Sequence, residues 1–306
     1  MLKPWIKSPM IRSAMIAALI AALIVAPAAI LSTARGDWQE KARSRVPLPQ
    51  VVDLRPGSFR YRLSGEFTRA ARPAMAPLMT IRMEHPLAIM KHQVTAAEYL
   101  RCVEAGSCVA PETDDAAPDH PVVGVSWRDA QAYATWLSRE TGQRFRLPTD
   151  EEWAFAAAGR VRDDALPESA YDGDPGRRLL AKYDRETSRE DPGDRIPRPI
   201  GSFGTNENEL LDVAGNVWEW TDTCFERSAM DENGGTKPAT LNCGVRIAAG
   251  RHRAYVPDFI RDANSGGCSA GKPPSNLGIR LVRDGGPGHR LWSFLGWYER
   301  LAGLSA

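Results

Sequence analysis

The stretch Leu210–Trp220, with the sequence LLDVAGNVWEW, decides the fold of this chain. Gly215-Asn216 is a turn signal, because both residue types tolerate positive φ angles. Trp218 and Trp220 follow at alternate positions, which places both indole rings on one face of an extended segment. The stretch therefore predicts a tight bend that leads into a strand with a tryptophan-rich face.

Two carboxylates flank the bend, Asp212 before it and Glu219 after it. Carboxylate oxygens and inward-turned carbonyls are the ligands that Ca²⁺ prefers in proteins. One interpretation is therefore a small calcium site at the bend. The alternative is a tight hairpin over a tryptophan-filled core, with both acids solvated.

Length and charge exclude some classes of protein. The chain has 306 residues, of which 43% are hydrophobic, so a sizeable core can form. Its 39 basic and 38 acidic residues give a net charge of +1. Because nucleic-acid-binding domains carry concentrated basic charge, we expect no nucleic-acid partner.

The positions of the five cysteines suggest two pairs. Cys102 and Cys108 bracket a short loop, and Cys224 and Cys243 bracket a longer one, while Cys268 is left over. In an oxidising compartment these two pairs predict two local disulfides. The alternative is a set of buried free thiols in a cytosolic protein.

The first 34 residues predict a membrane anchor or a signal segment. Basic residues precede an uncharged apolar run from Ala14 to Leu31, long enough nearly to cross a bilayer as a helix. We expect an uncleaved single-pass anchor in an inner membrane, with the rest of the chain in the periplasm because of the paired cysteines. The alternative is a cleaved signal peptide and a secreted or periplasmic protein.

The remaining chain divides into three parts. Residues 35–74 are polar and predict a linker that ends in an edge strand; residues 75–285 predict the main domain, and residues 286–306 an amphipathic tail. Within the domain, residues 79–90 predict a pair of strands and residues 161–198 a surface insertion without periodicity. Three helix starts carry a capping box, in which a Ser or Thr faces an acid three residues on. These boxes are Thr95 with Glu98, Ser126 with Asp129, and Thr149 with Glu152.

Several blocks, in this order, together resemble one family. They are HPVVGVSWRDA at 120–130, RLPTDEEW at 146–153, GNVWEW at 215–220 and NLGIR at 276–280. Blocks of this kind are the signatures of the formylglycine-generating enzyme, or sulfatase-modifying factor, family. The resemblance covers roughly residues 75–285.

The resemblance implies an α+β, variant C-type-lectin-like fold with antiparallel sheets, few helices and much irregular loop. It also implies Ca²⁺ at the bend. The ligands would be the side chains of Asp212 and Glu219 and the carbonyls of Gly215 and Val217.

The resemblance fails at the catalytic cysteines. Family members that make formylglycine hold Cu(I) between two neighbouring thiolates, and the matching positions here are Tyr255 and Ile260. We therefore expect no copper. We also expect no non-haem iron, because no two of the five histidines stand one helical turn apart.

The family's active cleft would lie at Arg251, His252, Arg253, Tyr255 and Asp258. A cationic, aromatic cleft suits an anionic or peptide ligand, and the alternative is a solvated loop. The first hypothesis is thus a membrane-anchored, periplasm-facing binding or accessory module in envelope protein maturation or signalling. The second is a protein oxidase of the family that uses another metal or cofactor. The third is a lectin-like adhesion domain.

Overall fold

The computed structural model describes residues 46–112, 117–163, 165–166, 174–187, 196–261 and 276–285. The predicted N-terminal anchor, the predicted C-terminal tail and Cys268 lie outside these residues. Among the residues described, no helix combines the length and the apolar character that crossing a membrane requires. The described residues from Leu48 onward belong to one compact unit.

The described strands form three sheets. The first is antiparallel, in the order β1 (Val51–Leu54), β6 (Leu87–Met90), β12 (Val282–Arg283), β7 (Phe145–Arg146). The smallest pairs β2 (Gly57–Arg62) with β5 (Leu78–Met83). In the first sheet β6 lies between β1 and β12, so this sheet contains strands from both ends of the domain.

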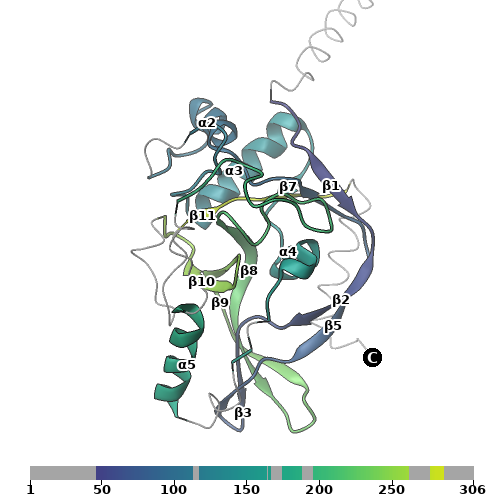
Figure 1. Cartoon of the computed structure of the whole chain (residues 1–306), viewed down its shortest axis with the longest axis vertical. Helices are drawn as coiled ribbons and strands as arrows, with labels where there is room; N and C mark the ends of the chain where they lie inside the picture. Colours follow the sequence, from purple (N-terminus) through teal and green to yellow (C-terminus); the bar gives the residue numbers. More distant parts are fainter. Residues whose placement is uncertain are drawn as a thin grey trace, which may run out of the picture. The chain divides into compact units, whose positions relative to one another are not determined.

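The second sheet carries the bend. Its order is β10 (Arg253–Pro257), β9 (Thr236–Ala249), β8 (Trp218–Met230), β3 (Glu66–Arg69), β4 (Arg72–Ala74), and β11 (Leu277–Gly278) pairs in parallel with the start of β8. The β8–β9 ribbon is long, and its far end extends beyond the helices (Figure 1). Because β8 starts at Trp218, the bend delivers its tryptophans and Glu219 directly into this sheet.

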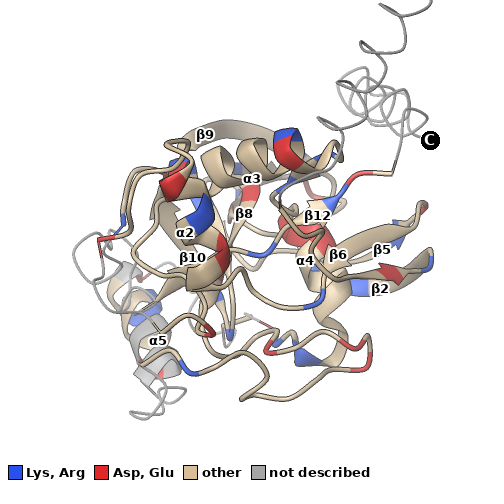
Figure 2. Cartoon of the chain, turned by 90° about the horizontal axis from the view of Figure 1, so that it is seen from above, with Lys and Arg blue, Asp and Glu red and all other residues tan. Residues whose placement is uncertain are grey.

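The helices are α2 (Ala96–Glu104), α3 (Trp127–Thr141), α4 (Asp150–Ala157) with a 3-10 turn at Ala158–Arg160, and α5 (Pro175–Thr187). The three predicted capping boxes are confirmed, with both reciprocal hydrogen bonds present at the start of α2, α3 and α4. Figure 2 shows acidic and basic residues together on α2 and α3, in keeping with the balanced composition. These helices start where the sequence satisfies their first N–H groups.

A hydrophobic core joins α4, the first sheet and the approach to the bend. Its buried members are Leu54, Leu87, Ile89, Trp153, Ala156, Ala157, Leu210, Val213, Ala249 and Val282. Three of these members, Trp153, Ala156 and Ala157, belong to α4. The core therefore fixes the position of the bend relative to α4.

Three expectations need correction. Residues 35–74 are not only a linker, because β1 to β4 lie within them and β1 pairs with β6. The strands expected around residues 79–90 exist, but β5 pairs with β2 and β6 with β1 and β12, so they do not pair with each other. The insertion at 161–198, expected to lack periodicity, contains the helix α5. The few apolar residues of α5 stand among charged ones, so the sequence shows no clear helical pattern.

Candidate functional site

The bend itself is held in left-handed backbone angles. Four residues in it or just before it have positive φ although none is glycine: Glu209 (60°), Asp212 (58°), Ala214 (57°) and Asn216 (61°). Such angles cost on the order of 1–3 kcal/mol each and persist only where the surroundings enforce them. The turn predicted at Gly215-Asn216 is confirmed at Asn216, which has a positive φ.

Side-chain hydrogen bonds enforce the bend at both ends. The Asp212 carboxylate accepts from the backbone N–H of Gly201 (2.5 Å) and of Phe203 (2.8 Å). The Asn216 amide accepts from Arg198 N–H and donates to Arg198 C=O, both at 2.9 Å. Both acids of the bend, Asp212 and Glu219, are fully buried, so the alternative with solvated acids is wrong.

A buried ion pair lies beneath the bend. The Arg280 Nε and Nη2 atoms donate to the two oxygens of Glu219 at 2.8 and 2.9 Å, and both side chains are 0% exposed. Arg280 also donates to the carbonyls of Met90 (3.0 Å), Lys91 (3.0 Å) and Leu211 (2.8 Å). A buried charge needs this complete set of partners, because leaving water is costly for an unpaired ion.

Two further donors complete the surroundings of Glu219. Trp153 Nε1 donates to Glu219 Oε2 at 2.7 Å, and Gln93 Nε2 donates to Glu219 Oε1 at 2.8 Å. Gln93 Nε2 also faces the carbonyls of Gly215 (3.3 Å) and Val217 (3.4 Å). Each oxygen of Glu219 thus accepts two hydrogen bonds.

The four predicted calcium ligands do not all surround one point in the structure. The oxygens of Gly215, Val217 and Glu219 converge, but the point of convergence is held by the Gln93 amide. The Asp212 carboxylate faces a different loop. Among the residues that the structure describes, no three His, Cys, Asp or Glu side chains gather as a metal site. Calcium at the bend stays a prediction.

A second polar cluster ties β2, α4 and β10 together. The Asp150 carboxylate, 2% exposed, accepts from the Tyr61 hydroxyl and from Arg253 Nε at 2.7 Å. The Arg253 guanidinium lies over the Tyr61 ring, 4.8 Å from its centroid. Burial, and then the Asp150 charge, raise the pKa of Tyr61 far above its usual value. Tyr61 therefore remains a neutral hydrogen-bond donor.

The five residues of the predicted cleft face different neighbours. Arg251, His252 and Arg253 line one small hollow of about 10 Å³, which holds on the order of one water molecule. The Tyr255 hydroxyl instead accepts from Gly65 N–H at 2.8 Å. Asp258 forms an ion pair with Arg128, at 3.1 Å to each carboxylate oxygen. The cleft as a ligand site stays a prediction.

A much larger groove of about 760 Å³ opens beside the Tyr61 cluster. Apolar side chains such as Ile81 line it together with acidic ones such as Glu84 and Glu226 and basic ones such as Arg82 and Arg283. Ligand sites in proteins commonly have volumes of about 300–1,000 Å³. The groove therefore has the size for a peptide segment, which the hollow at Arg251 lacks.

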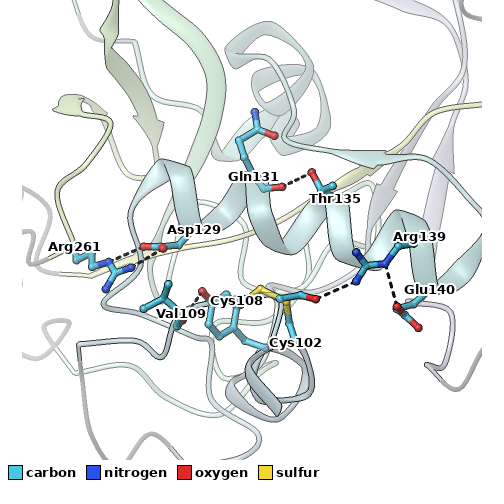
Figure 3. The surroundings of a disulfide bond; sticks show 11 residues. Cys102, Cys108, Val109, Asp129, Gln131, Thr135, Arg139, Glu140 and Arg261 are labelled. Carbon is cyan, nitrogen blue, oxygen red and sulfur yellow. Dashed lines mark hydrogen bonds and ion pairs between the residues drawn. A yellow bond between two sulfur atoms is a disulfide. The ribbon is translucent and has the colours of Figure 1, made fainter. Parts of the chain in front are cut away.

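Both predicted disulfides are present. Cys102 bonds with Cys108 across a separation of 6 residues, and Cys224 with Cys243 across 19. The first joins α2 to the loop that follows it, and Figure 3 shows it together with the ion pair of Arg261 and Asp129, at 2.6 and 2.7 Å. Of the five cysteines, four are thus bonded in pairs, and the fifth is Cys268.

His92, His120 and His252 each have a partner next to them in the sequence. His92 Nδ1 lies 2.8 Å from Gln93 O, His120 Nδ1 lies 2.9 Å from Asp119 Oδ1, and His252 Nδ1 lies 3.0 Å from Arg253 O. The rings of His92 and His252 thus contact a neighbouring backbone carbonyl, and the ring of His120 contacts a neighbouring carboxylate. The expectation about iron remains untested.

Sequence reasoning missed the residues that bind the predicted ones. No motif in the sequence marks Gln93 or Asp150 as a site residue, and Arg280 stands out only as part of the block NLGIR. A signal existed for Asp150, since an acid directly after an N-cap favours the helix N-terminus. No local pattern reveals that Gln93 or Arg280 meets Glu219, because they lie 126 and 61 residues away in sequence.

Comparisons with known proteins agree with the blocks in the sequence. The family model described as the Sulfatase-modifying factor enzyme 1-like domain matches residues 36–285. The chain is 32% identical to the formylglycine-generating enzyme of Bos taurus, over 64% of this chain and 53% of that protein. It is 33% identical to the inactive C-alpha-formylglycine-generating enzyme 2 of Bos taurus, over 52% of this chain and 54% of that protein.

The structure of PvdO from Pseudomonas aeruginosa matches with a TM-score of 0.49 and 22% identity, over 77% of this chain and 94% of that one. The chain spans about half the length of the curated relatives it matches. Its fold is α+β and of the variant C-type-lectin-like kind, as expected. The chain belongs to the sulfatase-modifying factor family.

Proposed function

We propose that this chain is a family member without copper chemistry, which binds a peptide or protein as an accessory module in the maturation or signalling of envelope proteins. The observation that carries this proposal is the state of the cysteines. A copper(I) site of the family's kind needs two neighbouring thiolates, and four of the five cysteines here are bonded as disulfides.

The position that a catalytic thiol would take is filled. Tyr255 stands there, with its hydroxyl bonded to Gly65 and its ring against Phe225, 5.2 Å between centroids in an edge contact. This arrangement supports a binding role, because Tyr255 connects β10 to the residue before β3 and to β8 and leaves no thiol at that point.

The groove beside Tyr61 is the proposed ligand site. Its volume suits an extended peptide, and its combination of apolar side chains with charged side chains of both signs offers both contact area and orientation. Tyr61 lines the groove, and its contacts with Asp150 and Arg253 hold its side chain in place there.

We place the domain in the periplasm on an uncleaved N-terminal anchor. Two disulfides support an oxidising compartment, and the apolar run at Ala14–Leu31 supports the anchor. Added protease should degrade the domain in spheroplasts and leave it intact in whole cells. Degradation only after lysis of the inner membrane would contradict this placement.

Two assays test the proposed function. With Cu(I) and O₂, the full chain should leave the thiol of a cysteine-containing peptide unchanged by mass spectrometry. Peptides selected from a display library for binding to the wild-type chain should bind Glu84→Arg, a substitution in the groove, at least tenfold more weakly. They should bind Glu104→Arg, a substitution at an exposed position of α2, as tightly as the wild-type chain. Oxidation of the peptide thiol, or equal binding by both variants, would refute the proposal.

A further inference from the structure

The Gln93 amide nitrogen lies where three oxygens of the bend converge. Glu219 Oε1 is at 2.8 Å, Gly215 O at 3.3 Å and Val217 O at 3.4 Å. One carboxylate oxygen and two carbonyls arranged around one point resemble part of an oxygen shell around a cation. Here the point is occupied by an N–H donor of this chain.

The charges around this point are already balanced. Glu219 is the carboxylate that faces it, and Arg280 pairs with both Glu219 oxygens at full burial. The second predicted acid, Asp212, is bonded to Gly201 and Phe203 instead. A divalent cation would add two buried positive charges without a matching acid, and burying unmatched charge is costly.

The orientation of the amide supports the same conclusion. Gln93 is 0% exposed, and its Oε1 atom has no hydrogen-bond partner in the described part of the chain. Reversing the amide would bring Oε1 against three other oxygens, which is favourable only with a cation among them. The orientation with Nε2 inward leaves one acceptor unpaired, a cost of about 1–3 kcal/mol in general, and satisfies the three oxygens without a metal.

From these contacts we infer that Gln93 replaces a cation at the bend. Its N–H groups and the Arg280 guanidinium together hold Gly215, Val217 and Glu219 in place. In place of the calcium site expected from the sequence, the bend of this chain is therefore independent of Ca²⁺, and residue 93 determines whether the bend binds a cation.

A matched pair of substitutions tests the inference on the full chain. Gln93→Glu places a second carboxylate among the three oxygens, whereas Gln50→Glu makes the same change at an exposed position before β1. Thermal unfolding and calorimetric titration are run in EGTA and in CaCl₂. The wild-type chain and Gln50→Glu should show no change in Tm and no binding heat. Gln93→Glu should gain at least about 5 °C at a hundredfold excess of Ca²⁺ over its Kd.

Two results would overturn the inference. The first is stoichiometric Ca²⁺ binding by the wild-type chain with a rise in Tm. The second is a folded Gln93→Glu variant that does not bind Ca²⁺, because residue 93 would then not be at the cation position.

An NMR measurement on the wild-type chain covers the case in which Gln93→Glu does not fold. The side-chain NH₂ protons of Gln93 should exchange slowly with solvent and should keep their shifts when CaCl₂ is added. A stoichiometric change of these signals with Ca²⁺, or fast exchange of the Gln93 protons in EGTA, would refute the inference.

Discussion

Replacing Arg280 by methionine should destabilise the domain strongly. The substitution leaves Glu219 buried with only Trp153 and Gln93 as donors, and removes the donor that three backbone carbonyls share. Breaking a buried ion pair by removing one partner costs about 3–5 kcal/mol. For a domain of this size, Tm should fall by about 6–20 °C.

The assay is urea unfolding followed by tryptophan fluorescence, with the slope m compared between variants to verify that the unfolding reaction is the same. Glu219→Gln in the same background tests the mechanism, because it removes the charge and keeps the shape. The cost of Arg280→Met should be about 2 kcal/mol smaller in the Glu219→Gln chain, since contacting charged residues couple by roughly this amount.

An exposed ion pair provides the control. Arg227 and Glu66 meet at 3.0 Å with side chains 54% and 31% exposed. Arg227→Met should cost less than about 1 kcal/mol, as exposed pairs generally do. If Arg280→Met costs no more than Arg227→Met, or if Arg280→Met costs the same in both backgrounds, the account of the buried pair is wrong.

Three further predictions concern the rest of the domain. Because folding raises the pKa of Tyr61, the stability it contributes is complete below the pKa of an unfolded tyrosine, about 10, and is lost as pH rises above it. Tyr61→Phe should therefore flatten the fall of the free energy of unfolding above pH 10 by up to about 1.4 kcal/mol per pH unit, measured by urea titrations, and an unchanged slope would contradict this. Ser126→Ala should cost about 1 kcal/mol in urea unfolding by removing the N-cap of α3, and a neutral result would contradict the capping role. Replacing Cys224 and Cys243 together by serine should cost about 2–4 kcal/mol, with no loss expected only if the bond is absent in solution.

Local chemistry made the helices and the bend predictable. Each capping box is complete within four residues, so the sequence contains all the information for the helix start, and all three boxes are confirmed. The disulfides were predictable for a similar reason, since the bonded cysteines are only 6 and 19 residues apart in the sequence.

Long-range contacts limited the prediction of the site. Because Glu219 alternates with two tryptophans, its sequence position predicts an acid that faces solvent. Its burial depends on Arg280 and Gln93, which come from distant parts of the chain. Likewise, the family resemblance predicts that Arg253 lies in a ligand cleft, but its partners in the structure are Asp150 of α4 and Tyr61 of β2. Charged residues that are buried by distant partners leave no periodic pattern in the sequence.

Counting free thiols tests the central claim most directly. The full chain is denatured without reductant, treated with a thiol-specific label and weighed by mass spectrometry. Because four of the five cysteines are in disulfides, one label per chain is predicted. Two or more labels on the intact chain would show that a pair of thiols is available for copper, and would contradict the proposal of a binding module without copper chemistry.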